Sequence, residues 1–126
     1  MSLRTPIGKV RGLGSAKEGT HHFWVQRVSA VALIPLTLWL VANLICMTGA
    51  GRDDVLDFLS SPFNAIVMLL LVIAGFYHLK LGIQVILEDY VHGEGAKLVT
   101  SLLNTFVCFA GGAVSVFAVL KIAFGG

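Results

Sequence analysis

Charged residues are scarce in this sequence: Lys, Arg, Asp and Glu together account for 13% of its 126 residues. Hydrophobic residues account for 56%, and the mean hydropathy is +0.87. A soluble domain carries about twice this share of charge, because its surface must face water. The composition therefore excludes an ordinary soluble domain. We expect a protein of the lipid membrane with no nucleic-acid partner.

Cysteine is rarer still, with Cys46 and Cys108 as the only two. Both lie in long apolar runs, and the topology inferred below separates their depths by roughly 10 Å at the helical rise. We therefore expect no disulfide and interpret each as a small core residue. The sequence contains neither a cysteine cluster for iron–sulfur ligation nor a flavin-binding fold.

Three long apolar runs dominate what is present. A helix needs about 20 residues, each rising roughly 1.5 Å, to cross the hydrocarbon core of a bilayer. The runs at 28–47, 65–87 and 98–120 meet this length, and the first and third contain no charge. We predict an all-α integral membrane protein with three transmembrane helices. A basic amino-terminal arm, residues 1–27, precedes a transmembrane domain, residues 28–126.

The distribution of basic residues predicts the orientation of the chain. Six basic residues fall on the side of the amino terminus and second loop, whereas Arg52 and Lys121 fall on the other side; the six are Arg4, Lys9, Arg11, Lys17, Arg27 and Lys97. Because cytoplasmic loops are enriched in Lys and Arg, we expect a cytoplasmic amino terminus. The polar amino-terminal stretch is unlike a secretory signal, but a mitochondrial presequence stays open as an alternative.

Local residues predict where the second span begins and ends. Ser61 before Pro62 is typical of an N-cap followed by proline at the first helical position, and Gly93 and Gly95 are expected to end that span. Pro35 should kink the first span, because proline lacks the backbone N–H of a helical hydrogen bond. The third span carries a small-residue surface that favours close helix packing, formed by Ala110, Gly111, Gly112, Ala113 and Ser115.

His78 is the one histidine within a predicted span. It lies nine residues before Leu87, which places it roughly 14 Å below the inner surface at the helical rise. A polar side chain at that depth needs a partner, because lipid offers none. The residue alone is compatible with an interhelical hydrogen bond, a proton relay or a metal bond.

The spacing of polar residues places several of them on the face of His78. Asp89 follows eleven residues later, which at about 100° per residue returns to within roughly 20° of the same face. Gly82 lies one turn from the histidine and leaves room for a flat, bulky group. Tyr90 adjoins Asp89 at the rim. Lys80 is about 200° away from His78 and does not join this stripe.

The stretch GTHHFWVQRVSA at the start of the first span gathers His21, His22, Trp24 and Arg27 at the same cytoplasmic level. Aromatic and cationic residues commonly anchor a helix at the membrane interface. Alternatively, Arg27 and a histidine face inward and neutralise an anionic group. Both interpretations fit the sequence.

These features together resemble the small membrane-anchor subunits of succinate dehydrogenase, in their alphaproteobacterial branch. The resemblance rests on SAKEGTHHFWVQR, on H-x5-R before the first span, on H-x10-D-Y in the second, and on the three spans. It implies that His78 is an axial ligand of haem b, that Tyr90 and Asp89 bind the quinone, and that Arg27 and His21 lie near the haem propionates or the quinone pocket. No catalytic residue is assigned to this chain.

The resemblance also implies partners and a location. A second anchor subunit would supply the other haem ligand and complete a heterodimeric helical bundle, while a flavoprotein and an iron–sulfur subunit would deliver electrons to ubiquinone. The expected location is the bacterial inner membrane, with the mitochondrial inner membrane as the alternative. Two other functions stay open from the residues alone: a homo-oligomeric proton-coupled transporter using His78 and Asp89, and a purely structural anchor.

Overall fold

The computed structural model describes residues 16–125, with side chains described from His21 onward, His22 excepted. Within this range the chain is all-α and has four helices, α2 (Ala16–Cys46), α3 (Arg52–Ser60), α4 (Pro62–Tyr90) and α5 (Glu94–Ala123). The predicted basic arm lies largely outside the described residues, which hold none of Arg4, Lys9 and Arg11.

Three of these helices are long and apolar enough to cross a membrane: Phe23–Cys46 within α2, Pro62–Tyr90 and Glu94–Ala123. The prediction of three spans is confirmed, and each helix is longer than the apolar run that predicted it, although α2 ends one residue before its run does. A helix of 29 residues is about 43 Å long, against about 30 Å for the hydrocarbon core. The helix ends therefore reach the headgroup region, where polar side chains meet water.

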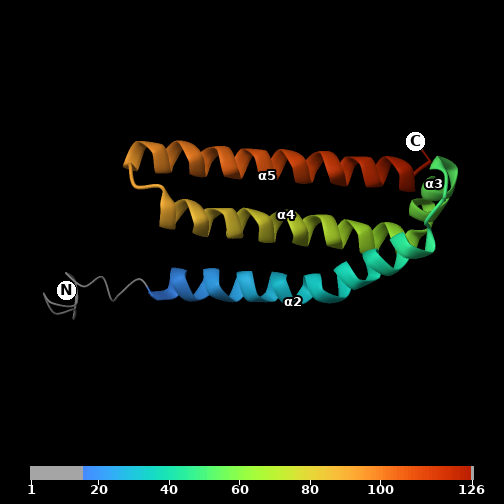
Figure 1. Cartoon of the computed structure of the whole chain (residues 1–126), viewed down its shortest axis with the longest axis horizontal. Helices are drawn as coiled ribbons and strands as arrows, with labels where there is room; N and C mark the ends of the chain where they lie inside the picture. The colour runs from blue at the N-terminus through green and yellow to red at the C-terminus, as the bar shows by residue number, and fades with distance from the viewer. Residues whose placement is uncertain (1–15, 126) are drawn as a thin grey trace, which may run out of the picture.

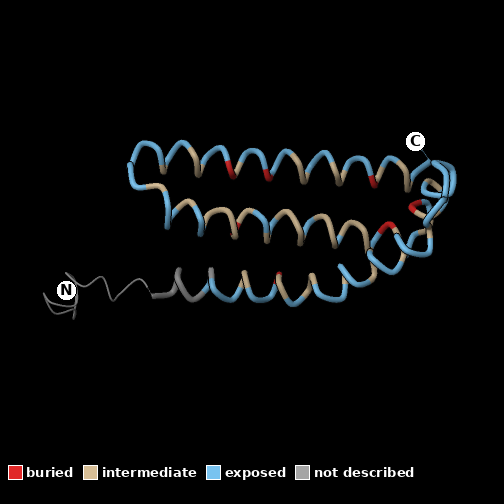
Figure 2. Tube along the Cα trace, viewed as in Figure 1, coloured by how far each residue is buried: buried red, intermediate tan, exposed pale blue. Residues whose placement is uncertain are grey.

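The three long helices lie side by side in one flat layer, with α4 between α2 and α5 (Figure 1). Helix α4 contacts both neighbours, whereas α2 and α5 share no contact in the described part of the chain. Few of the described residues are buried, and exposed positions run along all three long helices (Figure 2), many of them large hydrophobic residues. Such faces require lipid or another apolar protein surface against them.

Helix α3 was not predicted, because its residues are too polar for a span. Its first turn contains Asp53 and Asp54, whose negative charge suits the positive end of the helix dipole. The Asp54 carboxylate also accepts a hydrogen bond from the Gly51 N–H, at 3.0 Å. Phe58 stacks on Trp39 of α2 with ring centroids 5.7 Å apart, so this short helix lies against the end of the layer.

The predicted boundaries of the second span are correct at one end only. Helix α4 begins after Ser61 with Pro62 in its first turn, as predicted, although the Ser61 side chain makes no capping hydrogen bond. At the other end, α4 stops at Tyr90 because Val91 is extended (φ −95°, ψ 119°). The prediction that Gly93 and Gly95 end the helix is wrong: Gly93 caps α5, and Gly95 lies inside it.

Proline and glycine shape the packing as the sequence predicted. Pro35 lies inside α2, which changes direction in its second half (Figure 1). The small-residue surface of α5 is a packing surface within the chain, because Phe76 of α4 lies against Gly111 and Gly112. A Cβ at Gly111 would stand 2.8 Å from Phe76 Cε1, so this approach depends on glycine. Both cysteines are free, and Cys108 is buried as predicted, but the prediction that Cys46 is a core residue is wrong because Cys46 is exposed.

Candidate functional site

His78 lies in the middle of α4, half-buried, on the side that faces α2. Its Nδ1 atom is 3.0 Å from the Ser29 hydroxyl oxygen of α2. Ser29 is only 8% exposed, and its hydroxyl also donates to the backbone carbonyl of Gln26, at 2.9 Å. One ring nitrogen of the predicted intramembrane histidine is therefore held by a neighbouring helix, and the other has no hydrogen-bond partner among the described side chains.

A groove of about 350 Å³ lies beside this histidine, between α2 and α4, and is called here the histidine groove. It is lined by Phe23, Gln26, Arg27, Ala30 and His78. The Arg27 guanidinium lies 5.0 Å from the centroid of the Phe23 ring, a cation–π distance that keeps the cation beside the groove. The structure thus brings together two predicted site residues, Arg27 and His78, that are 51 positions apart in the sequence.

His21 lies elsewhere. It lines a second groove of about 490 Å³, together with Trp24, Val28, Ser29 and Tyr77. The helical periodicity separates His21 from Arg27 by about 120° around α2, which explains why the two predicted residues line different grooves. Ser29, whose hydroxyl contacts His78, lines the second groove and not the histidine groove.

Glycine flanks His78 on both sides along α4. Gly75 lies three residues before it and Gly82 four residues after it, so both share the histidine's face of the helix. A Cβ built at either glycine would meet no atom within 4 Å. The helix surface on each side of the imidazole is therefore thin and not filled by the chain's own described side chains. The prediction of free space at Gly82 is confirmed, and Gly75 extends it.

Asp89 and Tyr90 lie at the end of α4, about 17 Å from His78 at the helical rise. Both are exposed, Tyr90 to 77%. The carboxylate of the adjacent Glu88 accepts a hydrogen bond from Gln84, which also donates to Ser101 of α5 at 3.1 Å. Glu88 is thus linked to α5 through Gln84, whereas Asp89 is exposed and has no side-chain hydrogen bond among the described residues.

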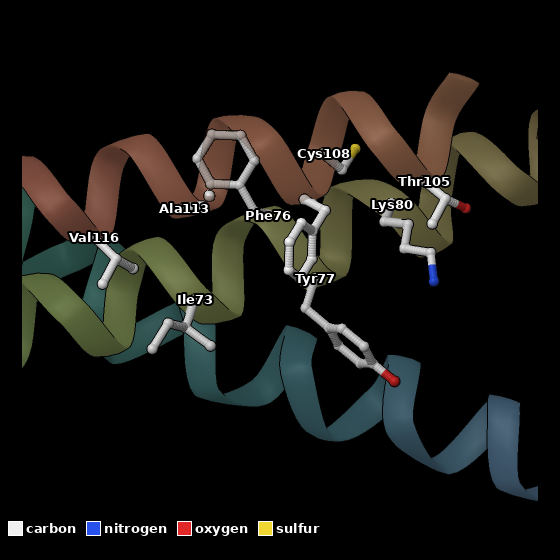
Figure 3. Close-up of a pocket in the computed structure, with 10 residues that line it drawn as sticks. Ile73, Phe76, Tyr77, Lys80, Thr105, Cys108, Ala113 and Val116 are labelled. Atoms are coloured by element: carbon white, nitrogen blue, oxygen red, sulfur yellow. The ribbon is translucent and has the colours of Figure 1, made fainter. Parts of the chain in front are cut away.

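Lys80 is separate from the histidine groove, as its helical angle predicted. It lines a third groove, between α4 and α5, of about 450 Å³. Figure 3 shows Lys80 at one end of this groove beside Thr105, with Ile73 and Val116 toward the other end. The Lys80 carbonyl accepts a hydrogen bond from the Asn104 side chain at 3.0 Å, which ties α4 to α5.

The described residues contain no group of three or more His, Cys, Asp or Glu side chains that could hold a metal ion together. A metal at His78 would therefore take one protein ligand from this part of the chain and need others from elsewhere. A haem iron fits this arrangement, because the porphyrin supplies most of its ligands and the protein adds only axial ones.

Two residues of this site were not singled out by sequence reasoning. Ser29 carries the hydrogen bond to His78, and Gly75 completes the open surface. The signal for Ser29 was present: it lies thirteen residues after Ala16, and His78 lies twelve before Tyr90, so two antiparallel helices put them at similar depth. The sequence did not reveal which helices are neighbours or how each is rotated.

Comparison with known proteins gives a consistent result. The chain matches the family described as succinate dehydrogenase/fumarate reductase transmembrane subunit over residues 1–118. The succinate dehydrogenase hydrophobic membrane anchor subunit of Rickettsia bellii (strain RML369-C) is 34% identical over 120 residues, covering 95% of this chain and 88% of the relative. The subunit of the same name from Paracoccus denitrificans is 33% identical over 125 residues, covering 99% and 96%.

A further relative is the succinate dehydrogenase membrane anchor subunit of Reclinomonas americana, which is 36% identical over 90 residues, covering 69% of this chain and 75% of the relative. No solved structure matches the chain. The family match and the Rickettsia and Paracoccus alignments span nearly the whole sequence, and the three long apolar helices are those of a multi-pass membrane protein. The chain therefore belongs to the succinate dehydrogenase/fumarate reductase transmembrane subunit family.

Proposed function

We propose that this chain is the hydrophobic membrane anchor of a succinate:quinone oxidoreductase. In this role it co-ligates a b-type haem through His78 and helps to form the quinone-reduction site through Tyr90 and Asp89. One observation carries the proposal: the imidazole of His78 is held at mid-helix by Ser29, between two glycines that leave the adjoining surface open.

The residues around His78 fit a haem. The Nδ1 atom is engaged by Ser29, so Nε2 is the ring nitrogen available to iron. Gly75 and Gly82 leave the flat space that a macrocycle needs on both sides of the ligand. Haem, when bound, supplies one-electron chemistry within the membrane. A haem iron held by two imidazoles needs a second histidine, and His78 is the one His in the three spans, so a partner chain supplies the other.

Arg27 has the charge and position to hold an anionic group beside His78. It lines the histidine groove, and a guanidinium forms strong paired hydrogen bonds with carboxylates such as haem propionates. His21 enters the proposal as a pocket residue on the other flank of α2, where it lines the second groove with Trp24 and Tyr77. Arg27 and His21 thus lie on different sides of α2 and line different grooves.

In this proposal Tyr90 and Asp89 act on a quinone at the membrane surface. Reduction of a quinone to a quinol adds two electrons and two protons, and negative charge develops on the carbonyl oxygens. The Tyr90 hydroxyl would donate a hydrogen bond to one carbonyl oxygen and stabilise that charge. Asp89 would orient Tyr90 or pass protons from water. Because both side chains are exposed, residues of other subunits complete the pocket.

The shape of the chain supports a second anchor subunit as its partner. A flat layer of three helices with apolar faces buries few of its own residues, and a second layer against it would make a helical bundle. A flavoprotein and an iron–sulfur subunit would dock at the end that holds Tyr90. With the amino terminus in the cytoplasm, that end faces the cytoplasm of a bacterium, and the anchor lies in the inner membrane.

The test is to purify the assembly through a tag on this chain and record its optical spectrum. We expect a flavoprotein and an iron–sulfur protein to co-purify, together with b-type haem absorption. His78→Ala should abolish or alter that absorption. A colourless homo-oligomer that purifies alone would instead support a proton-coupled transporter, and an unchanged haem spectrum in His78→Ala would refute the ligand role.

Tyr90→Phe tests the quinone site separately. Loss of one preorganised donor should lower quinone reduction by about 10² to 10³-fold, as at other sites that stabilise developing negative charge. Succinate oxidation by a water-soluble artificial acceptor should stay near the parent rate, because that acceptor bypasses the membrane. An equal loss in both assays would contradict a specific role for the hydroxyl.

A purely structural role of His78 is the second candidate, because a specific observation favours it: the Ser29 bond already satisfies one ring nitrogen within the chain. This candidate predicts that His78→Ala destabilises the helix pair while haem absorption remains. The proposed ligand role predicts instead that His78→Ala loses the haem absorption while the complex still assembles. The two outcomes are read from the same purified sample.

A further inference from the structure

The contact between Ser29 and His78 is the one hydrogen bond that joins side chains of α2 and α4 within the described residues. Its two groups come from positions 49 residues apart and meet at 3.0 Å in the apolar part of both helices. Ser29 is 8% exposed and His78 is half-buried. Lipid offers no replacement partner at this depth, so the bond persists only if its donor and acceptor are matched.

The protons of this pair can be assigned from the Ser29 contacts. A serine hydroxyl has one hydrogen to donate and two lone pairs that accept. The Ser29 hydroxyl directs its hydrogen to the Gln26 carbonyl, at 2.9 Å, which leaves only lone pairs for His78. With the Ser29 hydrogen on that carbonyl, the imidazole is the donor, which selects the Nδ1-protonated form of the two tautomers that this contact allows. In a neutral imidazole this leaves the Nε2 lone pair free.

We infer that Ser29 is the positioning residue for His78. Its hydroxyl fixes the imidazole in the tautomer whose Nε2 lone pair can bind iron, and it fixes the rotation of the ring. This inference rests on the proposed function of His78 as a haem ligand. Ser29 itself touches neither the haem nor the quinone in this assignment, and it acts through the imidazole.

The same bond should set the electronic character of the ligand. A histidine whose Nδ1–H donates to an acceptor is a more electron-rich ligand, and such outer hydrogen bonds orient metal ligands and tune the metal. An electron-rich ligand stabilises ferric iron over ferrous iron, which lowers the midpoint potential. Removal of the Ser29 acceptor should therefore raise the midpoint potential of the haem.

Three variants of the complete complex separate this role from simple packing. Ser29→Thr keeps the hydroxyl acceptor, Ser29→Cys keeps a similar volume with a much weaker acceptor, and Ser29→Ala removes the acceptor altogether. Ser115→Ala is the matched control, because the Ser115 hydroxyl also donates to a carbonyl of its own helix, at 2.8 Å from Gly111 O, but bonds no histidine. The readouts are the midpoint potential and the electron paramagnetic resonance spectrum of the oxidised haem.

We expect Ser29→Ala and Ser29→Cys to shift the midpoint potential to more positive values and to change the resonance spectrum. Ser29→Thr and Ser115→Ala should match the parent. If Ser29→Ala assembles without haem, the Thr and Cys variants decide between the roles. A packing role predicts that Cys resembles the parent and Thr does not, and that result would overturn the inference.

Failure of this inference is distinct from failure of the proposed function. If His78→Ala removes the haem absorption while all Ser29 variants keep the parent potential and spectrum, Ser29 has no positioning role but His78 remains the ligand. If His78→Ala keeps the parent spectrum, the ligand role is wrong and the Ser29 inference falls with it. Both arms use the same preparation of the whole complex.

Discussion

The two interfaces of α4 differ in what they contain. Against α5, α4 packs with Phe76 over Gly111 and makes hydrogen bonds through Asn104 and Ser101. Against α2, it makes a single side-chain hydrogen bond within the described residues, between His78 and Ser29. Helices in a membrane associate through close packing and interhelical hydrogen bonds, since lipid provides no hydrophobic drive. The α4–α5 interface therefore holds the chain together.

The α2–α4 interface instead carries candidate functional residues. His78 and Arg27 line one groove there, and His21 lines another. Looser packing leaves room for a group that is not part of the chain, and Gly75 and Gly82 keep that room open. One helix, α4, thus presents a packing face to α5 and an open face beside α2. Substitutions on the two faces should have different consequences.

The largest expected effect is at the open face. Gly82→Leu places a bulky side chain one turn from His78, in space where a Cβ now meets no atom within 4 Å. Because the space beside Gly82 is open at the Cβ, we expect the complex to assemble with most or all of its haem lost. The measurement is the haem absorption per complex. Gly95→Leu is the control, since Gly95 is equally open but lies at the start of α5.

Full haem content in Gly82→Leu would show that the open face does not receive the macrocycle. The proposed functional difference between the open face and the packing face of α4 would then be wrong. Loss of haem in Gly95→Leu as well would point to a general assembly defect, and the Gly82 result would carry no information about the site.

An intermediate effect is expected at the packing face. Gly111→Ala would place a Cβ 2.8 Å from Phe76, whereas Gly112→Ala would place one at an ordinary 3.6 Å. Both changes replace glycine by alanine in the same helix and gain the same helix propensity. The difference between their stabilities therefore reports the steric overlap with Phe76. Overpacking typically costs about 1 to 3 kcal/mol, and we expect Gly111→Ala to be less stable than Gly112→Ala by that amount. Thermal unfolding of the detergent-solubilised complex measures the difference.

Equal stability of the two glycine variants would mean that the Phe76 ring moves aside without cost, and the α4–α5 contact would then be less specific than its geometry indicates. The haem absorption of whatever complex remains should be unchanged in both variants. That result would sharpen the comparison, because it separates stability on one face from cofactor binding on the other.

The smallest effect is expected at Asn104. Asn104→Ala removes the hydrogen bond to the Lys80 carbonyl, and such bonds between membrane helices contribute about 0.6 kcal/mol on average and about 1.7 kcal/mol at most. We expect a lower unfolding temperature and unaltered haem absorption. Thr100→Ala is the control, because the Thr100 hydroxyl bonds only carbonyls of its own helix. A destabilisation no larger than that of the control would contradict a bridging role for Asn104.

Several features were predictable because they depend on properties local to the chain. The three spans follow from apolar length, and the start of α4 follows from the Ser61–Pro62 pair. The separation of Lys80 from His78 follows from helical geometry, since the rotation per residue is nearly constant. Helix α3 was missed because a short helix with three aspartates depends on its contacts, such as Phe58 on Trp39, more than on composition.

The sequence alone determined that this chain is a membrane protein with three spanning helices, and that His78, Asp89 and Tyr90 share one helix. Apolar length and helical periodicity decide these features, and both are written along the chain. Only the tertiary structure decided that Ser29 meets His78, that Arg27 shares its groove, and that Phe76 fills the space at Gly111. These contacts depend on which helices are neighbours and how each is rotated. That choice is made by packing across the whole layer, which no local stretch of sequence encodes.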